Sequence, residues 1–174
     1  PDESFIRADI PMTKREIRAS VVSRLSPAKD AIVYDIGAGT GSVSVELAMH
    51  ALYGTVYAVE RMKEGCELIA QNARKFGLDN IDIINASAAD VIEKLPAADS
   101  VFIGGSGGEL EKIMDIVLKK NPGVHIVITA VTLETLNDSV RLMEDKKVDV
   151  IDIVQIAVTQ IKKRGRYHML AANN

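Results

Sequence analysis

The sequence of 174 residues is poor in cysteine and in aromatic residues: it has one cysteine, Cys66, no tryptophan and 4% aromatic residues. A single cysteine excludes an internal disulfide and is typical of a reducing compartment, so we expect a cytoplasmic protein. The sequence also lacks an apolar run long enough to cross a bilayer, and residues 1–7 are polar with charges of both signs, unlike a signal sequence. We therefore expect no association with a membrane.

An excess of positive charge and the spacing of metal ligands are lacking as well. The formal net charge is −3, which argues against a general nucleic-acid-binding protein. The three histidines, His50, His125 and His168, are scattered without ligand spacing, so no bound metal is expected. Hydrophobic residues make up 47% of the chain and charged residues 26%, a balance typical of a folded globular chain.

Strand-like and helix-like segments alternate along the chain. The alternation predicts one α/β domain over residues 1–174, with an N-terminal segment and helix (1–30), an alternating β/α region (31–147) and a β-hairpin (148–174). We expect a Rossmann-like, mainly parallel seven-stranded sheet with a C-terminal antiparallel hairpin and helices on both faces. Thr13 and Glu16 have the form of a capping box, which predicts a first helix that ends at about Leu25. The other predicted helices cover residues 42–50, 63–76, 90–95, 109–120 and 133–146. The predicted strands cover residues 31–36, 55–59, 81–84, 100–103, 124–130, 148–161 and 167–171.

The most informative motif is the run Asp-Ile-Gly-Ala-Gly-Thr-Gly-Ser, which begins at Asp35 near the end of the strand predicted over 31–36. Glycines let a backbone pass close to a ligand, and the helix N-terminus that follows presents free N–H groups. The dinucleotide fingerprint requires glycine or alanine at position 42, where this chain has Ser42. The pattern instead resembles motif I of the class I S-adenosylmethionine-dependent methyltransferases; the alternative is an ordinary strand-to-helix turn. The candidate cofactor residues in this motif are Asp35, Gly37, Ala38, Gly39, Thr40 and Gly41.

Two further strand ends complete a candidate adenosine pocket. Glu60 ends the second predicted strand of the alternating region, where a carboxylate accepts both hydrogen bonds of a ribose diol; the alternative is a surface ion pair with Arg61. Residues 86–88 follow the next strand, and their small side chains leave room for adenine, although a plain loop is equally consistent. Since S-adenosylmethionine carries no phosphate, the glycine turn meets its methionyl end. Asp35 then either binds the methionyl ammonium or braces the turn.

Several classes of methyltransferase are disfavoured by the residues that follow the strand predicted over 100–103. The run Ile-Gly-Gly-Ser from Ile103 replaces the Asn- or Asp-Pro-Pro-aromatic element of amino-group methylation of bases. Methylation of pyrimidine carbon 5 needs a cysteine nucleophile at that place, whereas Cys66 lies within a predicted helix. No cluster of carboxylates suited to metal-assisted O-methylation is evident.

Four segments outside the glycine motif carry a family resemblance. They are residues 11–18, 102–109, 129–134 and 165–168, and together with the glycine motif they resemble the decarboxylating precorrin methyltransferases of cobalamin biosynthesis, whose stand-alone members act on cobalt-precorrin-6B. The likeness covers nearly the whole chain, and the double-glycine element at 104–108 is its most specific part. It implies methylation of carbon 15 of a corrinoid tetrapyrrole with loss of carbon dioxide from the ring C acetate, by a homo-oligomer, specifically a homotetramer.

The resemblance also assigns residues. For S-adenosylmethionine it implies Thr13, the glycine turn, Glu60 and Ala88, of which Ala88 lies in a segment that departs from the family's usual Gly-Asp-Ala-Pro pattern. For the substrate it implies a loop at which a flat ring approaches the methyl group, although the same loop also begins the next helix. The loop residues are Gly104, Gly105, Ser106, Gly107 and Gly108.

Methyl transfer from a sulfonium rests mainly on positioning, so no catalytic triad is expected. A substrate with many carboxylates favours cations at the rim of its binding site. Any single cation at the rim is equally consistent with a solvated basic surface. The candidate cations are Lys14, Arg15, Arg18, Lys162, Lys163, Arg164 and Arg166. Tyr167 and His168 are further candidates, His168 as an acid or base. The alternatives are an RNA or protein methyltransferase on the same fold and a non-catalytic subunit that binds S-adenosylmethionine.

Overall fold

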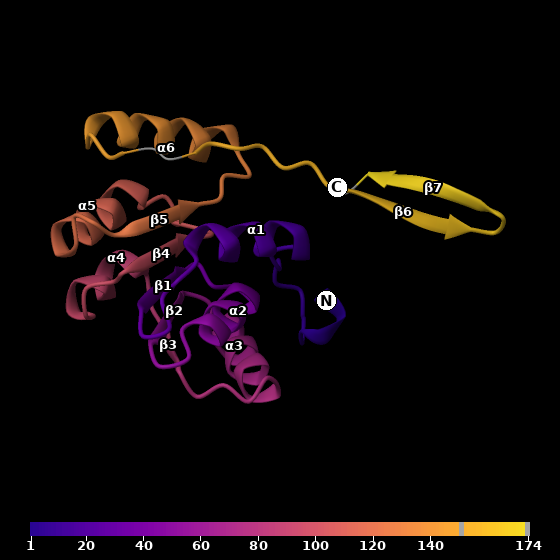
Figure 1. Ribbon diagram of the computed structural model, residues 1–174, viewed down its shortest axis with the longest axis horizontal. Helices are drawn as coiled ribbons and strands as arrows, with labels where there is room; N and C mark the ends of the chain where they lie inside the picture. Colours follow the sequence, from indigo (N-terminus) through magenta and orange to yellow (C-terminus); the bar gives the residue numbers. More distant parts are fainter. Residues whose placement is uncertain (150–151, 173–174) are drawn as a thin grey trace.

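The computed structural model describes residues 1–149 and 152–172, and its centre is a five-stranded parallel sheet (Figure 1). The strand order is β3-β2-β1-β4-β5. The strands are β1 (Ile32–Ile36), β2 (Thr55–Glu60), β3 (Ile81–Asn85), β4 (Ser100–Ile103) and β5 (His125–Ile128). The order reverses between β1 and β4, and a ligand site is expected beyond the carboxyl ends of strands at such a point.

Helices cover both faces of the sheet, because the central strands are buried and mostly apolar on both faces. On one face Val33 and Phe102 pack with helices α1 (Arg15–Leu25) and α2 (Ser42–His50), and α3 (Lys63–Lys75) lies against α2. On the other face Tyr34 and Val101 pack with the second group of helices. That group comprises α4 (Ala88–Val91), the 3₁₀ turn η2 (Ile92–Lys94), α5 (Leu110–Lys120) and α6 (Leu133–Asp145). The α/β architecture with a parallel sheet is thus confirmed. Among the described residues no helix has the length and apolar character needed to cross a membrane.

The expected capping box at the first helix is wrong. Helix α1 begins at Arg15, and the residue that precedes it, Lys14, has extended backbone (φ −63°, ψ 149°) with no side-chain cap. Thr13 lies outside the helix, where its carbonyl accepts a hydrogen bond from the side chain of Arg18. The side chain of Arg18, rather than a capping side chain of Thr13, therefore holds the backbone before the helix.

The expected seven-stranded sheet is also wrong, because the last two strands do not join the central sheet. β6 (Thr159–Arg164) and β7 (Tyr167–Ala172) pair antiparallel in a separate two-stranded sheet that projects away from the rest of the chain (Figure 1). The long strand expected over 148–161 does not form: residues 152–158 have no regular structure, and residues 150–151 lie outside the described part of the chain. A β-branched, alternating run favours extended backbone, but only a pairing partner makes it a strand.

Candidate active site

The glycine turn lies at the carboxyl edge of the sheet, between β1 and α2. Gly37, Gly39 and Gly41 have φ values of 73°, 57° and 76°, which only glycine adopts without strain. The amides of Gly37 and Ala38 donate to the carbonyl oxygen of Val59, at 3.0 and 3.2 Å, so the turn crosses over the end of β2. Gly41 is the N-cap residue of α2. The turn therefore lies over the carboxyl ends of β1 and β2, at the place where the sequence predicts a ligand.

Glu60 is bonded to this turn rather than to Arg61. Its Oε2 accepts a hydrogen bond from the amide of Gly39 at 2.9 Å, and its Oε1 accepts one from the amide of Met62 at 2.8 Å. The residue is only 8% exposed, and the structure shows no ion pair to Arg61 among the residues it describes. Each carboxylate oxygen keeps a free lone pair, so the geometry leaves capacity for two further donors.

Asp35 is completely buried beneath the turn. Its Oδ2 accepts a hydrogen bond from the hydroxyl of Ser44 on α2, while its Oδ1 has no partner within the described chain. Burial raises the pKa of Asp35 to about 6; the bond from Ser44 opposes that shift, and the charge of Glu60 adds to it. The bond to Ser44 braces α2 against β1, and the unbonded oxygen is available to a positively charged group. Both predicted roles of Asp35 are therefore compatible with the geometry.

The end of β3 meets Glu60 from the other side. The amide of Ala86 donates to the carbonyl oxygen of Glu60 at 3.2 Å, and the side chain of Asn85 donates to the same oxygen at 3.0 Å. Ala88, which is 8% exposed, begins the short helix α4, and Ser87 before it donates to the carboxylate of Glu109. The three predicted parts of the adenosine pocket thus lie at one edge of the sheet.

The two glycine segments touch each other. A Cβ atom placed on Gly37 would lie 2.6 Å from the carbonyl oxygen of Gly105, and the amide of Gly104 donates to the carbonyl oxygen of Ile36 at 2.9 Å. Beyond this contact a cavity of about 210 Å³ opens between the loop and the residues that follow β5. Its lining includes the whole segment from Gly104 to Gly108 together with Ile128, Thr129, Val131 and Thr135. The residues predicted for cofactor and for substrate are therefore adjacent.

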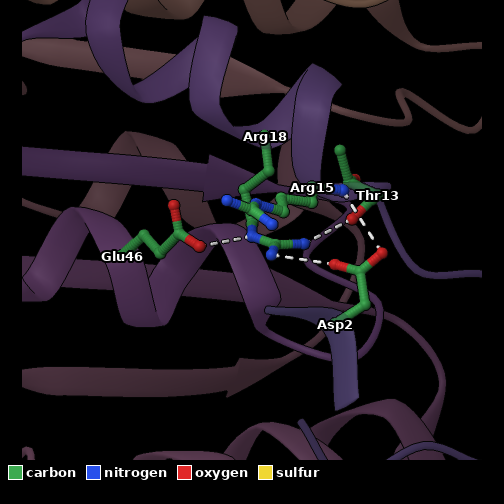
Figure 2. Close-up of polar contacts among 5 residues, drawn as sticks. All are labelled: Asp2, Thr13, Arg15, Arg18 and Glu46. Carbon is green, nitrogen blue, oxygen red and sulfur yellow. Dashed lines mark hydrogen bonds and ion pairs between the residues drawn. The ribbon is translucent and has the colours of Figure 1, made fainter. Parts of the chain in front are cut away.

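The cations predicted for the substrate are only partly available. Arg18 is fully buried, and its guanidinium is bonded to Asp2, Glu46 and the carbonyl of Thr13 (Figure 2). It therefore cannot bind a substrate carboxylate, and its assignment to the rim is wrong. Lys14 and Arg15 are exposed.

A cation that the sequence interpretation missed is Arg61. Its side chain is exposed, its carbonyl accepts a hydrogen bond from Asn85, and one guanidinium nitrogen would lie 3.4 Å from a Cβ atom on Gly107. Its sequence position beside Glu60 suggested an ion pair, whereas the side chain reaches across to the glycine loop. No motif in the sequence indicates that the side chain of Arg61 lies beside the glycine loop.

The hairpin residues are not brought to the site within one chain. Tyr167 and His168 lie on β7, which stands apart from the central sheet (Figure 1). Both are exposed. Any contribution of His168 to the site of this chain would need a second copy of the chain or a different position of the hairpin.

Cys66 lies on α3 near the site but has the wrong chemistry for a nucleophile. Its thiol donates to the carbonyl oxygen of Glu60 at 3.4 Å. Burial raises the pKa of the thiol, and the nearby charge of Glu60 raises it further. A raised pKa keeps sulfur protonated at neutral pH, so it is a poor nucleophile.

Comparison with known proteins decides the family. A family model described as precorrin methyltransferase domain matches residues 4–174, which is nearly the whole chain. The chain belongs to the precorrin methyltransferase family. This membership agrees with the resemblance carried by the glycine turn and the loop at 104–108.

Full-length relatives in this precorrin methyltransferase family are similar in sequence and in structure. A probable cobalt-precorrin-6B C(15)-methyltransferase (decarboxylating) of Pyrobaculum calidifontis is 38% identical, over 100% of this chain and 90% of the relative. The cobalt-precorrin-6B C(15)-methyltransferase (decarboxylating) of Salmonella typhimurium is 34% identical, over 99% of this chain and 90% of the relative. A solved structure named precorrin 8W decarboxylase, from Methanobacterium thermoautotrophicum, superimposes with a TM-score of 0.93 at 32% identity and covers 100% of this chain and 94% of that one.

Proposed function

We propose that this chain transfers a methyl group from S-adenosylmethionine to carbon 15 of a corrinoid precursor, cobalt-precorrin-6B or precorrin-6B, and removes the ring C acetate carboxyl as carbon dioxide. The observation that carries the proposal is the contact between Gly37 and Gly105, which puts a cofactor-type turn and an open, glycine-lined cavity side by side. The names of the full-length relatives favour this substrate over an RNA or a protein.

The residues at the sheet edge fit S-adenosylmethionine. Two buried side-chain oxygens of the described chain lack hydrogen-bond partners, Asp35 Oδ1 and Thr40 Oγ1, and both belong to the glycine motif. We assign the methionyl end to the turn, with the ammonium near Asp35, and the ribose hydroxyls to the carboxylate of Glu60. The adenine ring then lies against the segment that includes Ala88, and Thr13 approaches from the N-terminal side. When bound, the cofactor supplies an activated methyl group on a sulfonium.

The chain's own contribution to the reaction is positioning. The loop from Gly104 to Gly108 leaves room for a flat macrocycle, because a Cβ atom on Gly105 or Gly108 would meet nothing within 4 Å. The electrons that attack the methyl carbon come from the conjugated macrocycle. Loss of carbon dioxide leaves its bonding electron pair on the ring system and replaces those electrons. No strong base is needed in this scheme, so positioning supplies most of the rate enhancement.

Cations at the rim would bind the peripheral carboxylates of such a substrate. Arg61 is the best placed of them, because it reaches the glycine loop and has no ion pair within the described part of the chain. Lys14 and Arg15 are exposed near the end of the N-terminal segment and supply further positive charge.

We also propose that the chain is a single methyltransferase domain that works as a homo-oligomer, specifically a homotetramer. Exposed apolar side chains on α6 and on the segments before and after it support an interface, since a monomer rarely leaves so many together. They include Val131, which is 95% exposed, and Leu133, Leu136, Val140, Ile153, Val154 and Ile156. An interface that includes the projecting hairpin would also give His168 a route to the site of a second copy. Light scattering on the purified protein tests the tetramer.

The experiment that tests the activity is a cofactor-turnover assay on the purified chain. S-adenosylhomocysteine should accumulate with S-adenosylmethionine and a precorrin-6B-type substrate, and not when the substrate is replaced by RNA or a protein extract. Accumulation with RNA alone would contradict the proposed substrate. Absence of turnover with every substrate, despite cofactor binding, would favour a non-catalytic binding subunit.

A further inference from the structure

The N-terminal strap, defined here as residues 1–14, is attached to the protein at few points. Residues 7–9 are exposed, whereas Phe5 is buried, with its ring 5.0 Å from the ring of Phe76. A segment with few buried contacts opens locally more readily than the core does. A small number of polar side chains therefore hold the strap in place.

Arg18 is the first of these side chains (Figure 2). Its guanidinium donates to Asp2 at 2.9 Å and to the carbonyl oxygen of Thr13 at 2.7 Å, both in the strap, and to Glu46 on α2 at 2.6 Å. It also lies over the ring of Phe5, 4.8 Å from the centroid. A fully buried guanidinium is tolerated only when it is paired in this way, so both ends of the strap are fixed to α1 and α2.

Asn72 on α3 is the second, and it bonds the strap and the glycine turn at once. Its Oδ1 accepts from the amide of Ile6 at 2.7 Å, and its Nδ2 donates to the carbonyl oxygens of Ile6 at 3.1 Å and of Thr40 at 2.9 Å. The side chain is fully buried, so no water replaces these bonds. One amide group therefore connects the chain before α1 to the middle of the turn.

The strap also lies directly against the turn. A Cβ atom on Gly39 would lie 3.2 Å from the carbonyl oxygen of Pro11 and 3.8 Å from the side chain of Ile10. Ile10 and Pro11 therefore border the same backbone that we assign to the methionyl end of the cofactor. Any movement of the strap changes the wall of that site.

We propose that Asn72 and Arg18 are positioning residues of the cofactor site: Arg18 holds the strap at Asp2 and Thr13, and Asn72 couples the order of the strap to occupation of the turn. The proposal rests on the assignment of the turn to S-adenosylmethionine. A coupling of this kind is reciprocal, so a ligand in the turn must order the strap, and a loosened strap must weaken the ligand.

The test combines amide hydrogen exchange with calorimetry, and S-adenosylhomocysteine is the probe. In the unsubstituted protein the ligand should slow exchange of the Ile6 amide at least about tenfold, which corresponds to about 1.4 kcal/mol. Asn72→Ala should weaken the ligand by at least about tenfold and abolish this protection. The matched control is Asn80→Ala, because Asn80 also donates to two backbone carbonyls, of Ala48 and Ala51, away from the strap. It should leave affinity and protection unchanged.

The outcomes distinguish a failure of the proposed coupling from a failure of the proposed function. Ligand binding without protection of the strap in the unsubstituted protein would overturn the coupling, and this comparison needs no variant to fold. Undiminished affinity in Asn72→Ala would overturn it as well. Failure of the unsubstituted protein to bind S-adenosylhomocysteine would instead overturn the proposed function, and the coupling with it. If Asn72→Ala and Asn80→Ala weaken ligand binding equally, Asn72 has only a general structural role, and the proposal is contradicted.

Discussion

The two glycine segments at the edge of the sheet use glycine for opposite reasons. In the turn from Gly37 to Gly41 a side chain is excluded by neighbouring atoms, since a Cβ atom on Gly37 would lie 2.6 Å from backbone. In the loop from Gly104 to Gly108 a Cβ atom on Gly105 would meet nothing within 4 Å. A side chain at Gly37 is excluded because the protein fills the space, whereas at Gly105 the structure leaves space for something other than the protein. This difference supports the proposed roles of the turn in binding the cofactor and of the loop in binding a bulky substrate.

The largest effect is expected from Gly37→Ala, which breaks the packed segment. Its φ of 73° costs an alanine about 1–2 kcal/mol, and the new methyl group would also collide with Gly105. We expect the affinity for S-adenosylmethionine, measured by calorimetry, to fall by at least about a hundredfold. Gly77→Ala is the control: its φ of 68° brings the same strain, but nothing lies within 4 Å, so only stability should fall. Wild-type affinity in Gly37→Ala would refute the packed turn as the cofactor site.

The next effect comes from Gly105→Leu, which fills the open segment without disturbing the packed one. Its side chain would extend into the cavity of about 210 Å³, so turnover of a corrinoid substrate should stop while cofactor affinity stays within about twofold. Steady-state turnover and calorimetry on the same preparation make the comparison. Gly123→Leu, in an exposed turn, is the control and should keep both properties. Equal loss of binding and turnover in Gly105→Leu would move the loop to the cofactor.

A smaller effect is expected from Glu60→Gln. The amide supplies one acceptor oxygen where the carboxylate supplies two, and a hydrogen bond to a charged group contributes about 1.5–3 kcal/mol. Cofactor affinity should therefore fall about tenfold to a hundredfold, as measured by calorimetry. Glu64→Gln, exposed on the first turn of α3, should change nothing. If the two variants bind the cofactor equally well, Glu60 serves only to hold the turn through Gly39.

The last effect is on the free energy of unfolding rather than on binding, and it concerns Asp35, whose pKa is raised to about 6. Above its unfolded pKa of about 3.9 the unfolded chain loses this proton first, so the free energy of unfolding should fall as the pH rises from about 4 to about 6. Asp35→Asn removes this dependence, which is on the order of 3 kcal/mol. Denaturant unfolding at pH 4 and pH 7 measures it, with the variant gaining relative to the unsubstituted protein at the higher pH. An identical pH dependence in both proteins would show that the pKa of Asp35 is not raised in the folded protein.

Local signals in the sequence predicted the parts of the fold that local forces decide. The glycine motif predicted the end of β1 and the start of α2 at Ser42, and β4 forms over the predicted residues 100–103. At these positions the hydrophobic pattern changes from that of a strand to that of a helix, and the glycines between them mark a turn. The adjacency of the three strand ends followed as well, because the carboxyl ends of parallel strands share one edge.

Contacts between distant residues were beyond the reach of such signals. Asn72 bonds Ile6 across 66 positions, and nothing in its surroundings on α3 indicates this. The sequence assigns Arg18 to the substrate because a polycarboxylate favours cations around its site, yet Arg18 is fully buried and paired with carboxylates from two other elements. The hairpin was predicted to extend the sheet because its pattern favours strands, but the pattern does not specify which edge, if any, a strand joins.

Mass spectrometry of the reaction product is the decisive measurement of the proposed reaction. The purified chain is supplied with S-adenosylmethionine and a precorrin-6B-type substrate, and the mass of the corrinoid is followed. The expected product has gained one methyl group and lost one carbon dioxide, and forms in equal amount to S-adenosylhomocysteine. An unchanged corrinoid mass, with the cofactor consumed or not, would contradict it.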